Sequence, residues 1–298
     1  MTQDRVPLVL FDRSALHGAS MRQGYQRLIA KNRMRVLLPD ILLEEPLRVL
    51  TKTPSDPEPL REAVSNLLSL SPYPLKPISQ IIIHELATGQ TPCFSILEKR
   101  TVRIREIESI LREENPDPTL LAKAMNDHEV HVTNKEKLQA TRLRIRAETK
   151  PRLEKMGKDY NAGLQELRAE PGLFEAYWRN NGIEFSRLLL EEKLLPAEGL
   201  QDWQSMALTR KWAEAHWLFP ATTAAMRAWS QLAFSSHHAQ KKHIRANDQD
   251  DCKYLQYAQF ADLFVTADRT QSDASRLLYP RIPRLLTPQG LLELLGKC

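Results

Sequence analysis

The sequence predicts an α/β fold that is interrupted by a large all-helical insertion. Short apolar runs alternate with helix-like segments in residues 1–50, and the alternation returns after residue 247. Apolar runs of this length, bounded by turn-forming residues, are typical of buried strands. The intervening chain carries charged segments with helical spacing of apolar residues. We therefore predict an α/β domain with its N-terminal part in 1–94, a helical insertion or second domain over 95–240, and the C-terminal part of the first domain in 241–298.

The predicted elements follow from these patterns. The apolar runs expected to form buried strands are Val6–Phe11, Met34–Leu38, 262–266 and 284–288. The predicted helices around them cover 21–31, 41–50, 61–70, 251–261 and 289–295. The segments 51–59 and 71–77 are proline-rich and are expected to form loops. The apolar segment 78–86 fits either a strand or a helix.

All five tryptophans lie in the helical insertion, at Trp178, Trp203, Trp212, Trp217 and Trp229. Clustered aromatic side chains predict that this segment packs a hydrophobic core of its own. Stacking on nucleic-acid bases is the alternative use of these side chains.

The composition is that of an ordinary globular protein, with 42% hydrophobic and 27% charged residues. The net charge of +5 is compatible with a nucleic-acid partner. The three cysteines, Cys93, Cys252 and Cys298, form no disulfide framework or zinc motif, which favours a reducing, cytoplasmic location. No apolar stretch approaches the roughly 20 residues needed to cross a bilayer, so no membrane partner is expected.

Four carboxylates occupy positions from which one site can form. Asp12 directly follows the first predicted strand, and Asp268 lies just past the end of another. Ligands of parallel α/β sheets bind at the carboxyl ends of strands, so these two acids converge if their strands are neighbours. Glu44 falls in the first turns of the helix after the second strand. Asp251 heads the predicted helix 251–261, on the stripe that faces the core.

Carboxylates gathered in this way repel each other, and a hard divalent cation relieves the repulsion. Mg²⁺ and Mn²⁺ prefer carboxylate and water oxygens, and they activate water for attack on phosphoryl groups. We therefore predict that the metal ligands and catalytic residues of a phosphodiester hydrolase are Asp12, Glu44, Asp251 and Asp268.

Each acid also has a structural interpretation. Asp12 and Asp268 are both compatible with turns, and Asp251 with a favourable position near a helix start. Glu44 is compatible with an exposed helix position, and Glu45 is its rival for the site.

At both ends the sequence resembles the PIN-domain family of nucleases. DCKYLQYAQFADLFVTADR resembles the family's helix opened by an acid and its strand ending in Thr-x-Asp, at Asp251, Thr266 and Asp268. LVLFDRSAL and LLPDILLEEPL resemble the opening strand and the second element, with their acids at Asp12 and Glu44. RLLTPQGLLELL resembles the close of many PIN domains. The likeness does not extend through 51–86, and compact PIN domains have far fewer residues between the second acid and the third.

The resemblance implies a PIN-like parallel sheet flanked by helices, bound Mg²⁺ or Mn²⁺, and hydrolysis of RNA phosphodiester bonds by water. Ser14 and Thr266 would position the site, although Thr266 is equally compatible with merely ending a strand. The leading hypothesis is a metal-dependent endoribonuclease, in the manner of toxins and defence effectors. The alternatives are a non-catalytic PIN scaffold that binds RNA or protein, and a structure-selective DNA nuclease. A regulatory protein partner bound through the helical insertion is a further hypothesis.

A basic segment, SSHHAQKKHIR, precedes the helix that carries Asp251. We predict that phosphates near the cleavage point, in RNA more readily than in DNA, are contacted by Lys241, Lys242, His243 and Arg245. A solvated helix or loop is the structural alternative for this segment.

Overall fold

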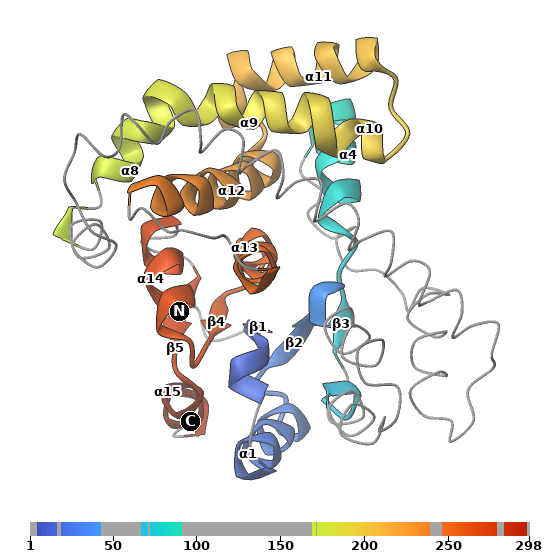
Figure 1. The fold of residues 1–298 in the computed structure, drawn as a ribbon. Helices are drawn as coiled ribbons and strands as arrows, with labels where there is room; N and C mark the ends of the chain where they lie inside the picture. Colours follow the sequence, from blue (N-terminus) through green and yellow to red (C-terminus); the bar gives the residue numbers. More distant parts are fainter. Residues whose placement is uncertain are drawn as a thin grey trace, which may run out of the picture.

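A five-stranded parallel sheet flanked by helices forms the base of the computed structural model (Figure 1). The strand order is β3-β2-β1-β4-β5. The strands are Leu8–Phe11 (β1), Arg35–Leu38 (β2), Tyr73–Pro74 (β3), Leu263–Val265 (β4) and Arg284–Leu286 (β5). The structure describes residues 5–16, 19–42, 67–70, 72–90, 169–170, 172–238, 246–278 and 283–296. The α/β class predicted from the sequence is confirmed.

The two ends of the chain meet at the centre of this sheet. β1 pairs in parallel with β2 on one side and with β4 on the other, which brings Phe11 beside Val265. Val9, Leu10 and Phe11 are fully buried, as expected for a central parallel strand covered on both faces. The strands that precede Asp12 and Asp268 are therefore neighbours, which is the condition for those acids to converge.

One face of the sheet is covered by α1 (Ala19–Ala30) and α15 (Pro288–Gly296), which pack against each other. Successive side chains of a strand point to opposite faces, and Val9, Phe11 and Val265 share this side with the two helices. The core on this side also contains Ala15 and Tyr25, which lie next to the start of the loop that follows β1.

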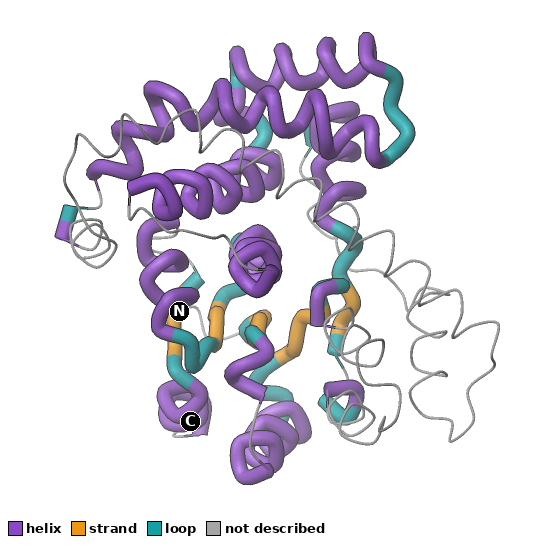
Figure 2. Tube along the Cα trace, viewed as in Figure 1, coloured by secondary structure: helices purple, strands orange, loops and turns teal. Residues whose placement is uncertain are grey.

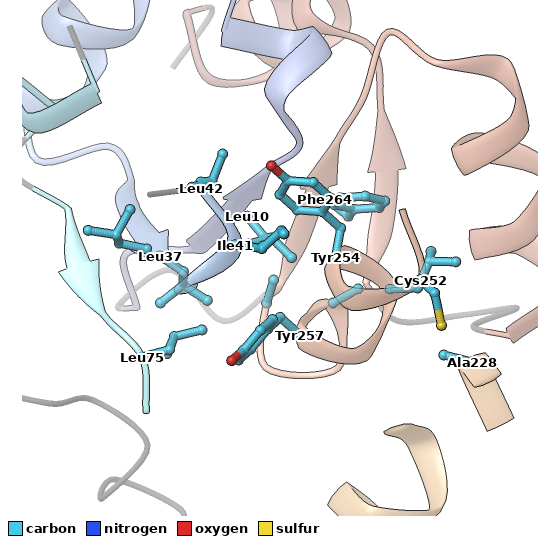
Figure 3. Close-up of a cluster of buried hydrophobic side chains, with 14 of the residues drawn as sticks. Leu10, Leu37, Ile41, Leu42, Leu75, Ala228, Cys252, Tyr254, Tyr257 and Phe264 are labelled. Atoms are coloured by element: carbon cyan, nitrogen blue, oxygen red, sulfur yellow. The ribbon is translucent and has the colours of Figure 1, made fainter. Parts of the chain in front are cut away.

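The other face is covered by α13 (Ala246–Ala258), which lies between the sheet and the helices beyond it (Figures 1 and 2). Leu10 and Phe264 point to this side and pack in one core with Tyr254 of α13 (Figure 3). Ala228, from a helix in the layer beyond, joins the same core. The core therefore fixes the helix that carries Asp251 against the strands that carry the other acids.

The layer beyond α13 is helical (Figure 2). Its elements are α4 (Ile78–Thr88), α8 (Gly172–Tyr177), η2 (Trp178–Gly182), α9 (Ile183–Leu189), η3 (Leu190–Leu194), α10 (Leu195–Ala197), α11 (Asp202–Glu214), η4 (His216–Leu218) and α12 (Pro220–His238). α12 packs against both α13 and α4. The helical character predicted for the insertion is confirmed in 172–238, whereas 95–168 lies outside the described residues. The division into domains remains a prediction.

Of the five tryptophans of the insertion, two are buried, two are exposed, and Trp229 is partly buried against the core. Trp178 and Trp212 are buried, and their rings lie 6.5 Å apart in an edge-to-face arrangement. Trp203 and Trp217 are 66% and 67% exposed, so these two contribute little to the core that the clustered tryptophans predict. The buried residues of α11 are Ser205, Thr209 and Trp212, whereas η4 contains no buried residue. Ile82 of α4 joins the same core, which the insertion therefore shares with an earlier segment.

Three local predictions need correction or completion. The ambiguous segment 78–86 is helical and belongs to α4, which ends where Gly89 adopts a φ of 70°. The short strand β3 lies inside a predicted proline-rich loop. The helix α14 (Arg269–Leu278) was not predicted. The helices predicted over 41–50 and 61–70 lie mostly outside the described residues.

In the described part of the chain, no helix is long and apolar enough to cross a membrane.

Candidate active site at the carboxyl edge of the sheet

Asp12 is a buried carboxylate at the carboxyl end of the central strand, only 3% exposed. Its Oδ1 accepts hydrogen bonds from the Ser14 hydroxyl at 2.5 Å and from the Ala15 N–H at 3.0 Å. The Thr266 hydroxyl donates to the other oxygen, Oδ2. An ionised carboxylate only accepts hydrogen bonds, so three donors around one carboxylate favour its charged form.

The same hydroxyls join the loops that follow β1 and β4. Ser14 Oγ accepts the Ala267 N–H at 2.9 Å, and Thr266 Oγ1 accepts the Asp268 N–H at 2.9 Å. Each hydroxyl thus receives a backbone hydrogen bond and donates its own hydrogen to Asp12. The two residues predicted to position the site, Ser14 and Thr266, are both in contact with Asp12.

Burial raises the pKa of Asp12 above its ordinary value of 3.8. The hydrogen bonds from Ser14, Thr266 and Ala15 act in the opposite direction but do not cancel this effect. No ion pair involves Asp12 within the described part of the chain. Nearby, burial and then the charge of Asp12 raise the pKa of Tyr25 to about 12, so this phenol stays neutral. Among the described residues, the negative charge of Asp12 therefore has hydrogen-bond donors around it but no neutralising cation.

This raised pKa predicts the sign of a pH effect on stability. Below the pKa of Asp12 in the unfolded chain, the stabilisation that goes with the raised pKa is fully present. It is lost as the pH rises through the folded-state pKa, because the unfolded chain then gives up the proton more readily. In EDTA, the free energy of unfolding of the natural protein should fall relative to that of Asp12→Asn as the pH rises through the folded-state pKa of Asp12, which lies above 3.8. Urea unfolding of both proteins at a series of pH values measures the difference between their free energies of unfolding. A difference that stays constant with pH contradicts the prediction.

Asp268 lies on the loop after β4 and is exposed. Its Oδ1 accepts the Gln271 N–H at 3.0 Å, which satisfies one of the free backbone donors in the first turn of α14. Asp268 therefore caps the N-terminus of α14, which begins at Arg269. The backbone N–H of Asp268 and the carboxylate of Asp12 meet at one hydroxyl, that of Thr266, while the Asp268 side chain is exposed.

Asp251 is half-buried on α13, on the same stripe as the buried residues Tyr254, Leu255 and Ala258. Asp251 therefore lies at the margin of the stripe that packs against the core. The prediction that it heads the helix is wrong, because α13 already begins at Ala246. The preceding polar residues were not recognised as helical, although acidic side chains are well tolerated in the first turns of a helix.

Several predicted site residues lie outside the described residues. They are Glu44 and the basic set Lys241, Lys242, His243 and Arg245. Within the segments that the structure describes, no group of three His, Cys, Asp or Glu side chains is close enough together to hold a metal ion. The described residues therefore neither assemble nor exclude the predicted site of four acids, because Glu44 is not among them.

A further carboxylate at this edge was missed by the sequence reasoning. Asp40 comes shortly after β2, and its Oδ1 accepts the Tyr257 hydroxyl at 2.9 Å and the Ile41 N–H at 2.8 Å. The Tyr257 oxygen accepts the Ile78 N–H at 2.8 Å, which ties α13 to the start of α4. The sequence contains a feature that could have indicated Asp40, because this residue follows a buried strand as Asp12 does. Three adjacent strands, β2, β1 and β4, therefore each lead into an aspartate.

Comparisons of the chain with protein-family models, with curated proteins and with solved structures found no match. The similarity to PIN domains therefore rests on the sequence segments quoted above.

Proposed function

We propose that this chain is a metal-dependent endoribonuclease with a PIN-like fold. The observation that carries the proposal is the buried carboxylate of Asp12 at the end of the central strand, which has three hydrogen-bond donors and no cationic partner in the described part. A buried charge without a counter-ion is costly unless hydrogen bonds and a cation offset the cost. A divalent ion at this edge would supply the missing charge.

The donor chemistry of the edge fits Mg²⁺ or Mn²⁺. Both ions prefer carboxylate oxygens, which Asp12 and Asp268 offer on adjoining loops. We propose that the remaining carboxylate ligands are Glu44 and Asp251. When bound, such an ion supplies an activated water and neutralises charge that develops on a phosphoryl group.

The residues of the chain itself would orient this chemistry. Ser14 and Thr266 hold the Asp12 carboxylate with one hydroxyl on each oxygen, so its remaining lone pairs have fixed directions. Thr266 also fixes the backbone of Asp268 through its N–H, which limits where that side chain lies. The hydroxyls thus favour the ionised carboxylate that a metal requires. Through Thr266, they also hold the backbone of Asp268 at a fixed position relative to Asp12.

A non-catalytic scaffold that binds RNA or protein is the second candidate, and one observation favours it. The oxygens of Asp12 have three donors, and Asp268 caps α14, so both acids have structural roles that need no metal. A scaffold with this site would neither bind Mg²⁺ nor cut RNA.

Thermal unfolding with added metal separates the two candidates. For the nuclease, Mg²⁺ or Mn²⁺ at about 100 times its dissociation constant should stabilise the fold by about 2.7 kcal/mol, and EDTA should reverse the effect. The same preparation should cut an end-labelled single-stranded RNA in Mn²⁺ but not in EDTA. Absence of both responses identifies the scaffold, and cleavage restricted to branched DNA identifies the DNA nuclease.

A further inference from the structure

An arginine directly follows the aspartate in each of the two adjoining loops. Arg13 follows Asp12 after β1, and Arg269 follows Asp268 after β4. Both arginines are exposed, whereas Asp12 is buried. Arg269 has no ion pair within the described residues. In each of the two loops, the candidate site thus places an exposed arginine directly after an aspartate, one of which is the buried Asp12.

Hydrogen bonds hold these two loops together. The Asp12 N–H donates to the Val265 carbonyl at 3.0 Å, and Ser14 Oγ accepts the Ala267 N–H at 2.9 Å. The residues before and after Arg13 are therefore both hydrogen-bonded to the loop that leads to Arg269, and this holds the backbone of Arg13 in place. The arginines accordingly share the carboxyl edge of the sheet, beside the acids.

A polyanionic substrate needs such cations at an acidic site. The carboxylates repel phosphate groups, and even a bound divalent ion neutralises only part of their charge. Arginine is always charged, and its planar fork matches the oxygens of a phosphate group. Cations on the rim therefore attract a sugar-phosphate backbone while the buried acid stays dedicated to the metal.

We propose that Arg13 and Arg269 bind phosphate groups of single-stranded RNA at the edge of the sheet that holds the Asp12 carboxylate. This inference rests on the proposed nuclease function, and it names the residues that hold the substrate backbone. These contacts are separate from those predicted for 241–245, which lies outside the described residues. The arginines bind and place the backbone, and no chemical step is assigned to them.

Equilibrium binding without cleavage tests the proposal. Fluorescence anisotropy with a labelled oligouridylate of about 12 nucleotides, in EDTA, is measured from roughly 50 to 200 mM NaCl. Arg13→Ala and Arg269→Ala should each weaken binding by about fivefold at the lower salt concentration. Each should also reduce the slope of log K against log salt by about 0.7, because one phosphate contact is lost. Arg269→Lys should keep the slope, since the charge remains.

The matched control is Arg284→Ala. Arg284 is also exposed, but it begins β5 and therefore lies at the opposite edge of the sheet. Its loss should leave affinity and salt slope unchanged. Unaltered binding by both Arg13→Ala and Arg269→Ala, or an equal loss in Arg284→Ala, overturns the proposal.

Cleavage by the natural protein is scored separately. RNA cleavage that proceeds while the arginine variants bind normally removes this inference and leaves the nuclease proposal standing. Binding that depends on both arginines in a protein that never cuts RNA supports the phosphate contacts and removes the nuclease proposal.

Discussion

Asp12→Asn is expected to reduce Mn²⁺-dependent RNA cleavage by roughly a thousandfold or more while the protein stays folded. Asparagine has nearly the same shape, but one oxygen becomes an N–H₂ group that cannot bind a cation. The amide nitrogen can take the place of Oδ2, where the Thr266 hydroxyl can rotate to accept from it, while Ser14 and the Ala15 N–H still donate to the remaining oxygen, so the loops remain joined. Initial rates on end-labelled RNA, together with circular dichroism and urea unfolding, measure both consequences. The metal-induced rise in melting temperature should also disappear.

Asp262→Asn is the matched control for this substitution. Asp262 precedes β4 and accepts the Leu8 N–H at 2.8 Å, so it is also a carboxylate bonded to a backbone donor. It lies at the opposite edge of the sheet, where no metal is proposed. Its substitution should leave cleavage intact. Cleavage at the natural rate by Asp12→Asn would show that a contaminating nuclease or a different site is responsible, and it would end the proposed mechanism.

Glu85→Gln should destabilise the fold by about 3 kcal/mol, the largest loss of stability that we expect from a single change. The Glu85 side chain is 0% exposed on α4. Its two oxygens accept the N–H groups of Ala221 at 3.0 Å and of Thr222 at 2.6 Å, the first donors of α12. The amide would direct an N–H₂ group at one of these donors, and the favourable charge at the helix N-terminus would be lost.

The loss should extend beyond α12. This helix contributes to the core that contains Phe264 and α13, so loosening its first turn also weakens the support of the candidate site. Urea unfolding should show a lower midpoint with an unchanged slope. Glu293→Gln is the control, because Glu293 is exposed on α15 and should tolerate the change within about 0.5 kcal/mol. A midpoint for Glu85→Gln equal to that of the control contradicts the role of Glu85.

The main strands and the placement of Asp12 and Asp268 were predictable because burial on both faces leaves continuous apolar runs in the sequence. Such runs end where the chain leaves the sheet, so the polar residues that follow are conspicuous. β3 was missed because it has only two residues and contains a proline, which resembles a loop. α14 was missed because its residues are mostly polar, with few apolar positions to mark a helix.

The hydrogen bonds of the candidate site were less accessible to sequence reasoning. Nothing local to Ser14 indicates that its hydroxyl accepts the Ala267 N–H, more than two hundred positions away. Likewise, Glu85 caps α12, and Tyr257 contacts Asp40. Each contact joins segments that are far apart in the chain, and no periodic pattern in the sequence marks such partners. Partners of this kind are selected by the packing of whole elements.

By itself, the sequence determined that apolar strands from both ends of the chain must be buried, and that acids follow those strands. Local hydrophobic patterning is sufficient for both conclusions. Only the tertiary structure decided that β1 and β4 are neighbours and that two hydroxyls connect their loops through Asp12. The physical reason is that strand order follows from how helices cover both faces of the sheet, which is a property of the whole folded chain.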